Sequence, residues 1–340
     1  MLSPQLIGIM VGVLTAVLFA SRESAGGYIA AILSFLMLLP LLLAGIGWGR
    51  NAAIIGMLVA GCLIGVAVSP LGTFEFAVYI GFPAVIFSQL VLLRRESLPD
   101  EETQASQTPQ PPSPIIKWYP FGHIVAWATV MAGTVMALAV SMMEDVTKER
   151  ESIQKMLLEG SGKDSMQQIF GPNFGQDSVE MVADIILRLV VPGFAGLFCV
   201  LVYLVNVWLA LKILSVSGQL GRPWPNFAKL EYPPLLMAAF MCAIGISIQP
   251  GIGGSMAMAY VGAFAFAYLL LGLAVVHYWA ASTSFPIFIL AAVYIGLLSG
   301  GIMTLGLAIT LMFLGLGDPL FQLRERIPQL PPSSDDGDFK

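Results

Sequence analysis

Long apolar runs recur along the whole chain and constrain its fold more than any other feature. Hydrophobic residues make up 57% of the sequence and charged residues only 11%, against roughly 45–50% and 25% in a soluble domain. A helix needs about 20 apolar residues to cross a bilayer, and backbone groups find no water partner there. The runs therefore predict an all-α, polytopic transmembrane helical bundle, in contact with the lipid bilayer and without a β-sheet.

The apolar runs predict between eight and ten membrane spans, and we favour ten. The last run, Phe285–Leu316, is long for one span and contains Ser299–Gly301 in its middle, which favours two short helices. A single kinked or tilted helix is the alternative for this run. The other expected spans are Gln5–Ala20, Tyr28–Gly47, Asn51–Ser69, Phe74–Leu93, Phe121–Met143, Phe194–Ile213, Leu235–Gln249 and Met256–Trp279.

Polar segments between the runs divide the chain into six parts. A stretch rich in Pro, Gln, Ser and Glu cannot bury a core and is expected to be disordered. The parts are an N-terminal four-helix membrane region (1–93), a disordered cytoplasmic linker (94–116), the fifth span (117–143), an extracytoplasmic segment (144–192), a C-terminal membrane region (193–318) and a cytoplasmic polar tail (319–340).

The extracytoplasmic segment is expected to contain one amphipathic helix, Asp177–Val190. Its apolar residues recur at helical spacing on one face, and its charged residues recur every four positions on another. Pro192–Gly193 is expected to break this helix from the next span. The apolar set is Val182, Ile185, Ile186 and Leu189, and the charged set is Glu180, Asp184 and Arg188.

The basic residues favour a topology with both termini in the cytoplasm. With ten spans, ten of the sixteen Lys and Arg residues fall on the cytoplasmic side, as short loops generally show. Both termini on one side require an even number of spans. The net charge of −5 argues against a nucleic-acid partner, because that binding relies on Lys and Arg.

Motifs for catalysis are absent from the sequence. There is no phosphate-binding loop GxxxxGK[ST], no HExxH and no GxSxG, and the three cysteines form no CxxC pair. We therefore expect no enzyme activity, no metal site and no cofactor. Asn206 and His277 are the candidates for lining a polar cavity. The alternatives are an interhelical hydrogen bond for Asn206 and a place at the lipid headgroups for His277.

A stripe of small residues marks the first span. Gly8, Gly12, Ala16 and Ala20 recur every four positions, so one helix face is smooth enough for another backbone to approach closely. Two kinds of helix could pack on this face. One is a neighbouring span of the same chain, and the other is a helix of a partner subunit.

Five short motifs occur in order along the chain. The most distinctive includes Arg222, Pro223, Trp224 and Pro225, which we place in a cytoplasmic loop. Their order and spacing resemble the alphaproteobacterial branch of the YybS-like family, a domain-of-unknown-function group of bacterial membrane proteins. The motifs are Leu39–Gly49, Lys117–Pro120, Ser217–Pro225, Gly272–His277 and Leu316–Arg324.

The resemblance implies a bacterial inner-membrane protein without an established activity. The family is distantly similar to the substrate-binding S-components of energy-coupling-factor vitamin transporters, which dock a membrane partner through an AxxxA pattern. Ala16 and Ala20 match that pattern. This implies a substrate-binding transport subunit with a small-molecule ligand, a membrane partner subunit and a separate energy source. The alternative is a non-transport scaffold or assembly factor, with Glu144–Val182 and Arg222–Pro225 as contact surfaces.

Overall fold

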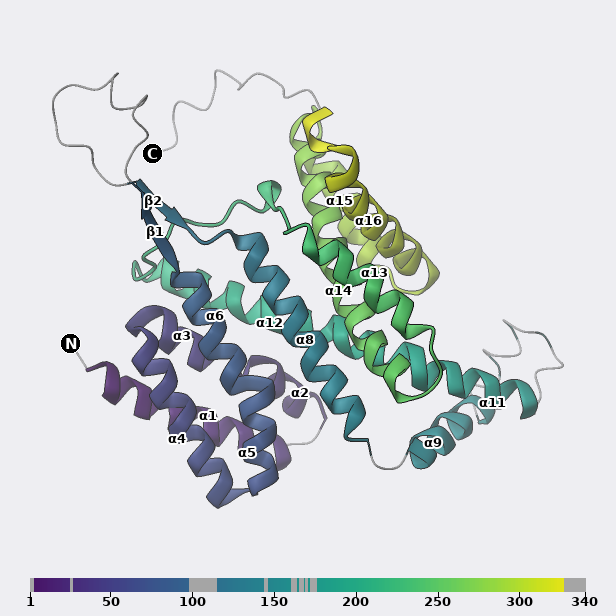
Figure 1. Cartoon of the computed structure of the whole chain (residues 1–340), viewed down its shortest axis with the longest axis horizontal. Coiled ribbons are helices and arrows are strands. Elements are labelled where there is room, and N and C mark those ends of the chain that lie inside the picture. Colours follow the sequence, from purple (N-terminus) through teal and green to yellow (C-terminus); the bar gives the residue numbers. More distant parts are fainter. Residues whose placement is uncertain are drawn as a thin grey trace. The chain divides into compact units, whose positions relative to one another are not determined.

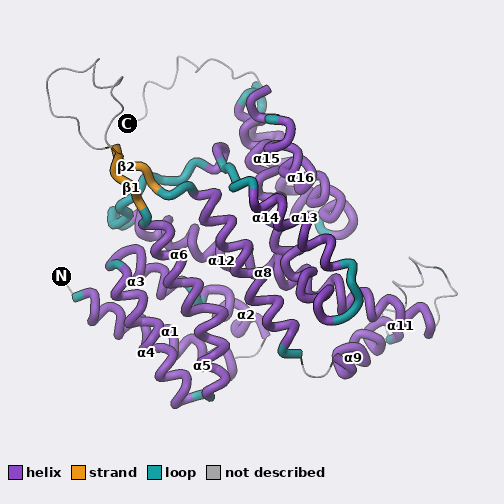
Figure 2. Tube along the Cα trace, in the orientation of Figure 1, coloured by secondary structure: helices purple, strands orange, loops and turns teal. Residues whose placement is uncertain are grey.

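The computed structural model describes residues 3–24, 27–97, 115–143, 146–159, 164, 168, 171 and 176–326, and most of them are helical (Figures 1 and 2). The chain separates into two compact units. Residues 1–139 and 198–225 form the first, and residues 140–197 and 226–340 form the second.

The first unit is a bundle in which the N-terminal helix packs along the fourth. A Cβ added to Gly12 would lie 2.7 Å from the carbonyl oxygen of Gly56, so the two backbones meet closely. Phe19 and Phe76 add an edge-to-face ring pair with centroids 6.1 Å apart. The helices are α1 (Pro4–Ser24), α2 (Gly27–Leu36), α3 (Leu39–Trp48), α4 (Arg50–Ala67), α5 (Pro70–Phe76), α6 (Phe82–Leu92) and α8 (Phe121–Ser141), with the later part of α12 (Val191–Val216).

Two prolines inside apolar helices are each preceded by a π-helical turn. One turn, η1 (Ala77–Gly81), comes before Pro83, and the other, η2 (Ile186–Val190), comes before Pro192. Proline cannot donate to the preceding turn and clashes with it, and a π turn locally relieves that strain. The expected break at Pro192–Gly193 is therefore wrong, since one helix runs without interruption over Ser178–Val216.

A two-stranded antiparallel ribbon corrects the expectations of no β-sheet and of a linker disordered from residue 94. Strand β1 (Arg94–Ser97) pairs with β2 (Ile115–Trp118), with Arg94 opposite Trp118. The Tyr119 amide continues the pairing by donating to the Leu93 carbonyl. The extended segment that follows α6 and the one that precedes α8 therefore pair their backbone N–H and C=O groups with each other. Residues 98–114 of the expected linker lie outside the described part.

The second unit is arranged around α14 (Ile252–Ala281), the longest of its helices. A Cβ on Gly272 would clash with the Leu311 carbonyl, and one on Gly315 would clash with the Tyr268 carbonyl. Glycine therefore allows α14 and α16 to cross in close contact. The other helices are α9 (Val146–Leu158), α11 (Gln176–Ile185), α13 (Leu235–Ser247), α15 (Pro286–Leu298) and α16 (Gly301–Phe321).

The last apolar run forms two helices. Gly300 and Gly301 have φ angles of 77° and 66°, a region that glycine adopts without strain. The Thr304 hydroxyl donates to the Gly296 and Leu297 carbonyls across this turn. The expectation of two helices is confirmed for this run, with a break next to Ser299.

Eight helices in the described part are long and apolar enough to cross a membrane. Two further apolar helices, α13 and α15, have 13 residues each. At 1.5 Å per residue they are about 20 Å long. Length alone therefore supports a multi-pass protein with eight candidate spans, and the favoured count of ten depends on these two short helices.

The helices α9 and α11 pack against each other in the second unit. Leu157 meets Val179 and Ala183 in a small buried cluster, with Val182 and Ile186 packed against it. Asp184 accepts hydrogen bonds from Arg150 at 2.6 Å and from Arg188 at 2.9 Å. Of the apolar set expected for this amphipathic helix, Val182 and Ile186 thus meet a second helix of the chain, whereas Ile185 and Leu189 are exposed.

Candidate functional site

The C-terminal end of α16 folds back on itself through a buried ion pair. Gln322 adopts a left-handed conformation with φ of 52°, and its amide donates to the Asp318 carbonyl. Arg324 then returns toward the helix. Its Nη2 and Nε donate to Asp318 Oδ2 at 2.6 and 2.9 Å, and its backbone amide donates to Oδ1 at 3.3 Å. The side chains of Asp318 and Arg324 are only 5% and 15% exposed.

The same guanidinium reaches a second segment of the unit. Arg324 Nη1 donates to the Ala228 carbonyl at 2.9 Å. Ala228 belongs to a short 3₁₀ turn, η3 (Phe227–Lys229), which is followed by non-helical chain up to Pro234. One side chain therefore joins the end of α16 to the segment that precedes α13.

That non-helical segment extends along α14 toward the middle of the helix. The Tyr232 hydroxyl donates to the Ala267 carbonyl at 2.8 Å, and its ring meets the edge of Tyr268. Phe240 of α13 stacks on Tyr268 with centroids 5.6 Å apart. Pro233 and Pro234 precede α13, so the helix begins only beside Tyr268.

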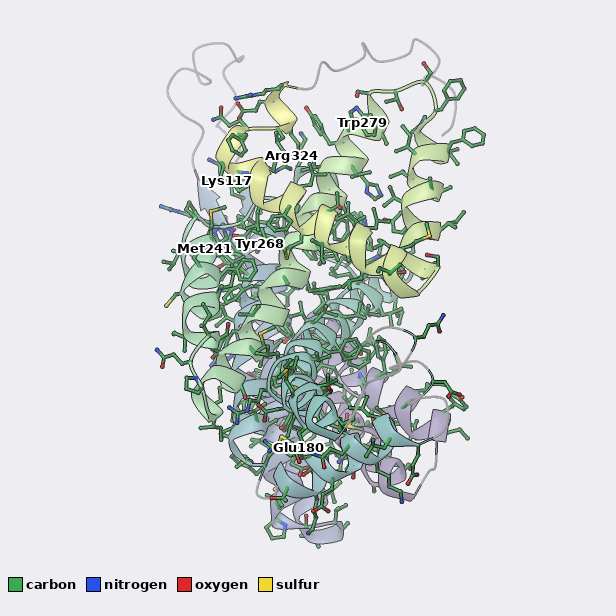
Figure 3. The ribbon with its side chains drawn as sticks, turned by 90° about the vertical axis from the view of Figure 1, so that its right-hand side faces the viewer. Lys117, Glu180, Met241, Tyr268, Trp279 and Arg324 are labelled. Atoms are coloured by element: carbon green, nitrogen blue, oxygen red, sulfur yellow. The ribbon has the colours of Figure 1, made fainter. Side chains whose placement is uncertain are left out.

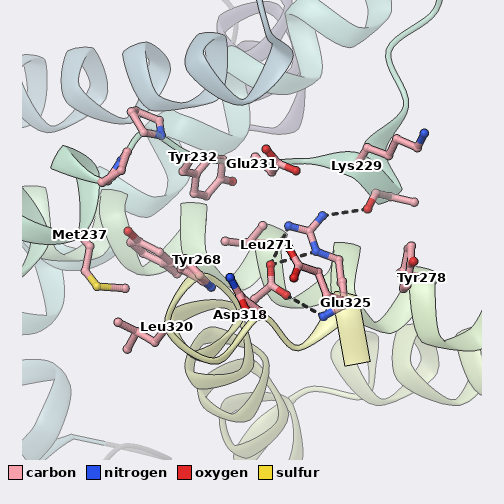
Figure 4. A pocket seen from close by; sticks show the side chains of 16 residues that line it. Lys229, Glu231, Tyr232, Met237, Tyr268, Leu271, Tyr278, Asp318, Leu320 and Glu325 are labelled. Atoms are coloured by element: carbon pink, nitrogen blue, oxygen red, sulfur yellow. Dashed lines mark hydrogen bonds and ion pairs between the residues drawn. The ribbon is translucent and has the colours of Figure 1, made fainter. Parts of the chain in front are cut away.

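A pocket of about 630 Å³ lies between these elements (Figure 4). In Figure 3 Tyr268 is seen deeper in the unit than Arg324 and Trp279, which lie near one end of it. The deep part is lined by the buried Tyr268 and Leu271 and the half-buried Met237, while the apolar Leu320 in the lining is exposed. The outer part is lined by charged and polar ones, Lys229, Glu231, Tyr278, Asp318, Arg324 and Glu325.

A family model described as "Predicted membrane protein (DUF2232)" matches residues 13–319. The chain belongs to this family. No curated protein and no solved structure matches the chain. Membership in DUF2232 confirms a membrane-protein family of unknown function over most of the chain. The match covers α16 as far as Pro319, so it includes Asp318 but not Arg324.

In this DUF2232 protein the small-residue stripe of α1 faces a helix of the same chain. Cβ atoms on Gly8 and Gly12 would lie 2.8 and 2.7 Å from carbonyl oxygens of α4. Ala16 is buried and Ala20 is half-buried. At Gly8 and Gly12, therefore, the stripe serves internal packing.

The loop motif that contains Arg222 is anchored within the first unit. Arg222 is 8% exposed and donates to the Val91 carbonyl at 3.1 Å, at the end of α6. Burial lowers the pKa of the Arg222 guanidinium from its ordinary value. The Lys212 ammonium lies over the ring of Trp224. Pro223 and Trp224 are exposed, whereas Pro225 is buried. The motif thus closes one end of α6.

Asn206 and His277 belong to different units and have local partners. The Asn206 amide donates to the Phe35 carbonyl at 2.7 Å, where α2 ends before Pro40, and to Val202 of its own helix. His277 Nδ1 lies 2.8 Å from the Leu273 carbonyl, and its Nε2 lies 3.4 Å from the Tyr294 hydroxyl. Neither residue lines the pocket described above.

Sequence reasoning missed the pocket, although parts of it were visible. Asp318 and Arg324 both belong to the motif Leu316–Arg324. Nothing in their spacing, however, indicates an ion pair that also contacts Ala228. Tyr232, Tyr268 and Tyr278 looked like ordinary aromatic residues near helix ends. Among the described residues, no group of three or more His, Cys, Asp or Glu side chains is arranged to hold a metal ion.

Proposed function

We propose that this protein is a membrane subunit that captures a small molecule in the pocket between α13, α14 and α16 and relies on a separate energy source. One observation carries the proposal: a pocket with a non-helical wall extends to the middle of an apolar, membrane-length helix. The proposal assigns no catalysis to this chain.

The depth of the pocket follows from the length of α14. Its 30 residues give a rod of about 45 Å, and Ala267 stands at its midpoint. Because Tyr232 donates to the Ala267 carbonyl, the non-helical segment reaches that midpoint. At membrane depth, irregular backbone is tolerated where it is buried or lines a polar cavity. Broken helices around a site near the midplane are typical of transporters.

The size and lining of the pocket also suit a ligand. Its volume of about 630 Å³ falls within the roughly 300–1,000 Å³ of small-molecule sites. Such sites combine apolar walls with a few placed polar groups. Here Met237 and Tyr268 supply apolar surface, while Glu231 and Glu325 supply polar groups at the outer part.

The topology in this proposal has ten membrane segments and both termini in the cytoplasm. Eight helices are long enough to cross alone, and α13 and α15 are the two short ones. The number of spans is even whether both short helices are counted or neither is. The pocket then opens on the cytoplasmic side, beside Arg324 and Arg326 at the end of α16, in agreement with the positive-inside rule.

Membership in the YybS-like branch, the relation to energy-coupling-factor S-components and the inner-membrane location belong to the same proposal. Because Gly8 and Gly12 pack on α4, the proposal assigns the docking of an energy-supplying partner to another surface of the chain.

Retention of a ligand by the purified protein tests the proposal. The full chain is purified in dodecyl maltoside, and bound small molecules are identified by native mass spectrometry. Met237→Trp places a large ring in the pocket, whereas Met241→Trp makes the same change one turn later on α13, at an exposed residue outside the pocket. We expect only the first variant to lose the ligand. No retained molecule in the wild type, or equal retention in both variants, contradicts the proposal.

A scaffold or assembly factor is the second candidate. The folded pair of α9 and α11, held by Arg150, Asp184 and Arg188, offers a polar surface that a partner protein could bind. Site-specific crosslinking from Lys155 on α9 and from Trp224 would capture such a partner. Crosslinks to one defined complex, combined with no retained small molecule, favour this candidate.

A further inference from the structure

The charges around the pocket are unbalanced toward negative. Three carboxylates line it, Glu231, Asp318 and Glu325, against two basic residues, Lys229 and Arg324. Asp318 is already neutralised by Arg324 at 2.6 Å. Lys229 is exposed, and Figure 4 shows it extending away from the carboxylates. Among the lining residues, Glu231 and Glu325 therefore give the outer part of the pocket an excess of negative charge, while the exposed Arg326 lies outside the lining.

Tyrosine rings line the pocket at three positions. Tyr232 and Tyr268 form an edge-to-face pair in the deep part, and Tyr278 lies nearer the mouth. Tyr268 and Tyr278 are ten positions apart along α14, which corresponds to about 15 Å. Aromatic faces attract ammonium groups, and sites for quaternary ammonium compounds are built from such rings.

We propose that the pocket binds an organic cation: an ammonium group carrying an apolar substituent. The ammonium group lies in the outer part with Glu231, Glu325 and Tyr278, and the apolar substituent points toward Tyr268 and Met237. An anion in the same position would face two carboxylates. This inference rests on the proposed function, since it names the class of molecule that the same pocket captures.

A bare metal ion fits the site less well than an organic cation. In the part of the chain that the structure describes, no three carboxylate, imidazole or thiol side chains converge as metal ligands. The carboxylates Glu231 and Glu325 are instead distributed around a cavity of about 630 Å³. A larger cation with an apolar body fills such a space and contacts the rings.

Three probes of nearly equal shape test the charge preference: choline, its neutral isostere 3,3-dimethylbutan-1-ol, and the anion 3,3-dimethylbutanoate. Binding to the full chain in dodecyl maltoside is measured by the concentration dependence of the melting temperature. We expect choline to bind at least about tenfold more tightly than the neutral isostere, as a cation facing rings and carboxylates should. The anion should bind most weakly.

Charge-removing variants assign the effect to the pocket. Glu231→Gln with Glu325→Gln should weaken choline binding about tenfold and leave the neutral isostere unchanged. Both residues are exposed, so the fold should persist, and the melting temperature without ligand checks this. Glu180→Gln removes an equally exposed acid on α11 and should change nothing.

The outcomes separate this inference from the proposed function. Equal binding of choline and the neutral isostere, or choline binding that is unchanged in the double variant, overturns the organic-cation assignment. In that case the loss of a retained ligand in Met237→Trp alone still supports the pocket. Binding of none of the three probes overturns the cation assignment, and if no small molecule is retained either, the proposed function also fails.

Discussion

Arg222 donates a hydrogen bond to the backbone carbonyl of Val91, which lies 131 residues earlier in the chain and 3.1 Å away. The carbonyl belongs to the last turn of α6, where a helix leaves its final acceptors unpaired. A buried cation at this position satisfies one acceptor and is favoured by the helix dipole.

Arg222→Met should destabilise the protein by about 1–3 kcal/mol, because a buried carbonyl loses its donor while the apolar stem is kept. The melting temperature in detergent measures the effect. Arg95→Met, at an exposed residue of β1, is the control and should have little influence. Equal melting temperatures for the two variants would show that the Arg222 hydrogen bond is not needed.

Gly12→Ala should destabilise the first unit by about 1–3 kcal/mol. The new Cβ would lie 2.7 Å from the Gly56 carbonyl oxygen and 2.8 Å from the Val59 Cβ, and a backbone atom cannot easily yield. At Gly61 the nearest atom is 3.7 Å away. Gly61→Ala should therefore be neutral or stabilising, given the better helix propensity of alanine. The melting temperatures of both variants measure these effects. A Gly61→Ala variant less stable than Gly12→Ala would contradict this packing of α1.

Asp318→Asn should cost about 3 kcal/mol or more, because it leaves the nearly buried Arg324 without its counter-charge. Adding Arg324→Gln should recover part of the loss, since the buried charge is then removed as well. A double-mutant cycle on unfolding in urea or SDS measures this coupling. Strictly additive effects would mean that the two side chains act independently.

Asn206→Leu should destabilise the first unit by about 0.5–1.5 kcal/mol, as expected for one hydrogen bond between membrane helices. The Phe35 carbonyl, which lies near the end of α2, would lose its donor at 2.7 Å. Thr310→Val serves as the control, because that hydroxyl donates only to Gly306 of its own helix. Thermal stability of Asn206→Leu equal to that of the control would argue against a structural role for the amide.

The positions of most helices could be predicted from the sequence because a membrane-spanning helix needs a long apolar run. Such a run can be recognised without any knowledge of contacts between distant segments. The two helices of the last run followed from Ser299–Gly301, since glycine marks a turn. The continuous helix through Pro192 could not be foreseen in this way. Proline usually indicates a break, and the π turn that accommodates it has no clear sequence signature.

The ribbon and the pocket were missed for a related reason. Strands β1 and β2 pair residues on either side of a polar stretch, and the average composition of that stretch conceals the pairing. The pocket is assembled from three segments, around Tyr232, Tyr268 and Asp318, which no periodicity connects. Contacts between distant segments depend on packing, which a single sequence does not reveal.

The uninterrupted helix Ser178–Val216 has a geometric consequence. Its 39 residues measure about 58 Å, nearly twice the 30 Å thickness of the hydrocarbon layer. A single helix of this length can cross a bilayer and still extend about 28 Å beyond the hydrocarbon layer, which leaves its N-terminal part, α11, free of the spanning requirement and able to pair with α9.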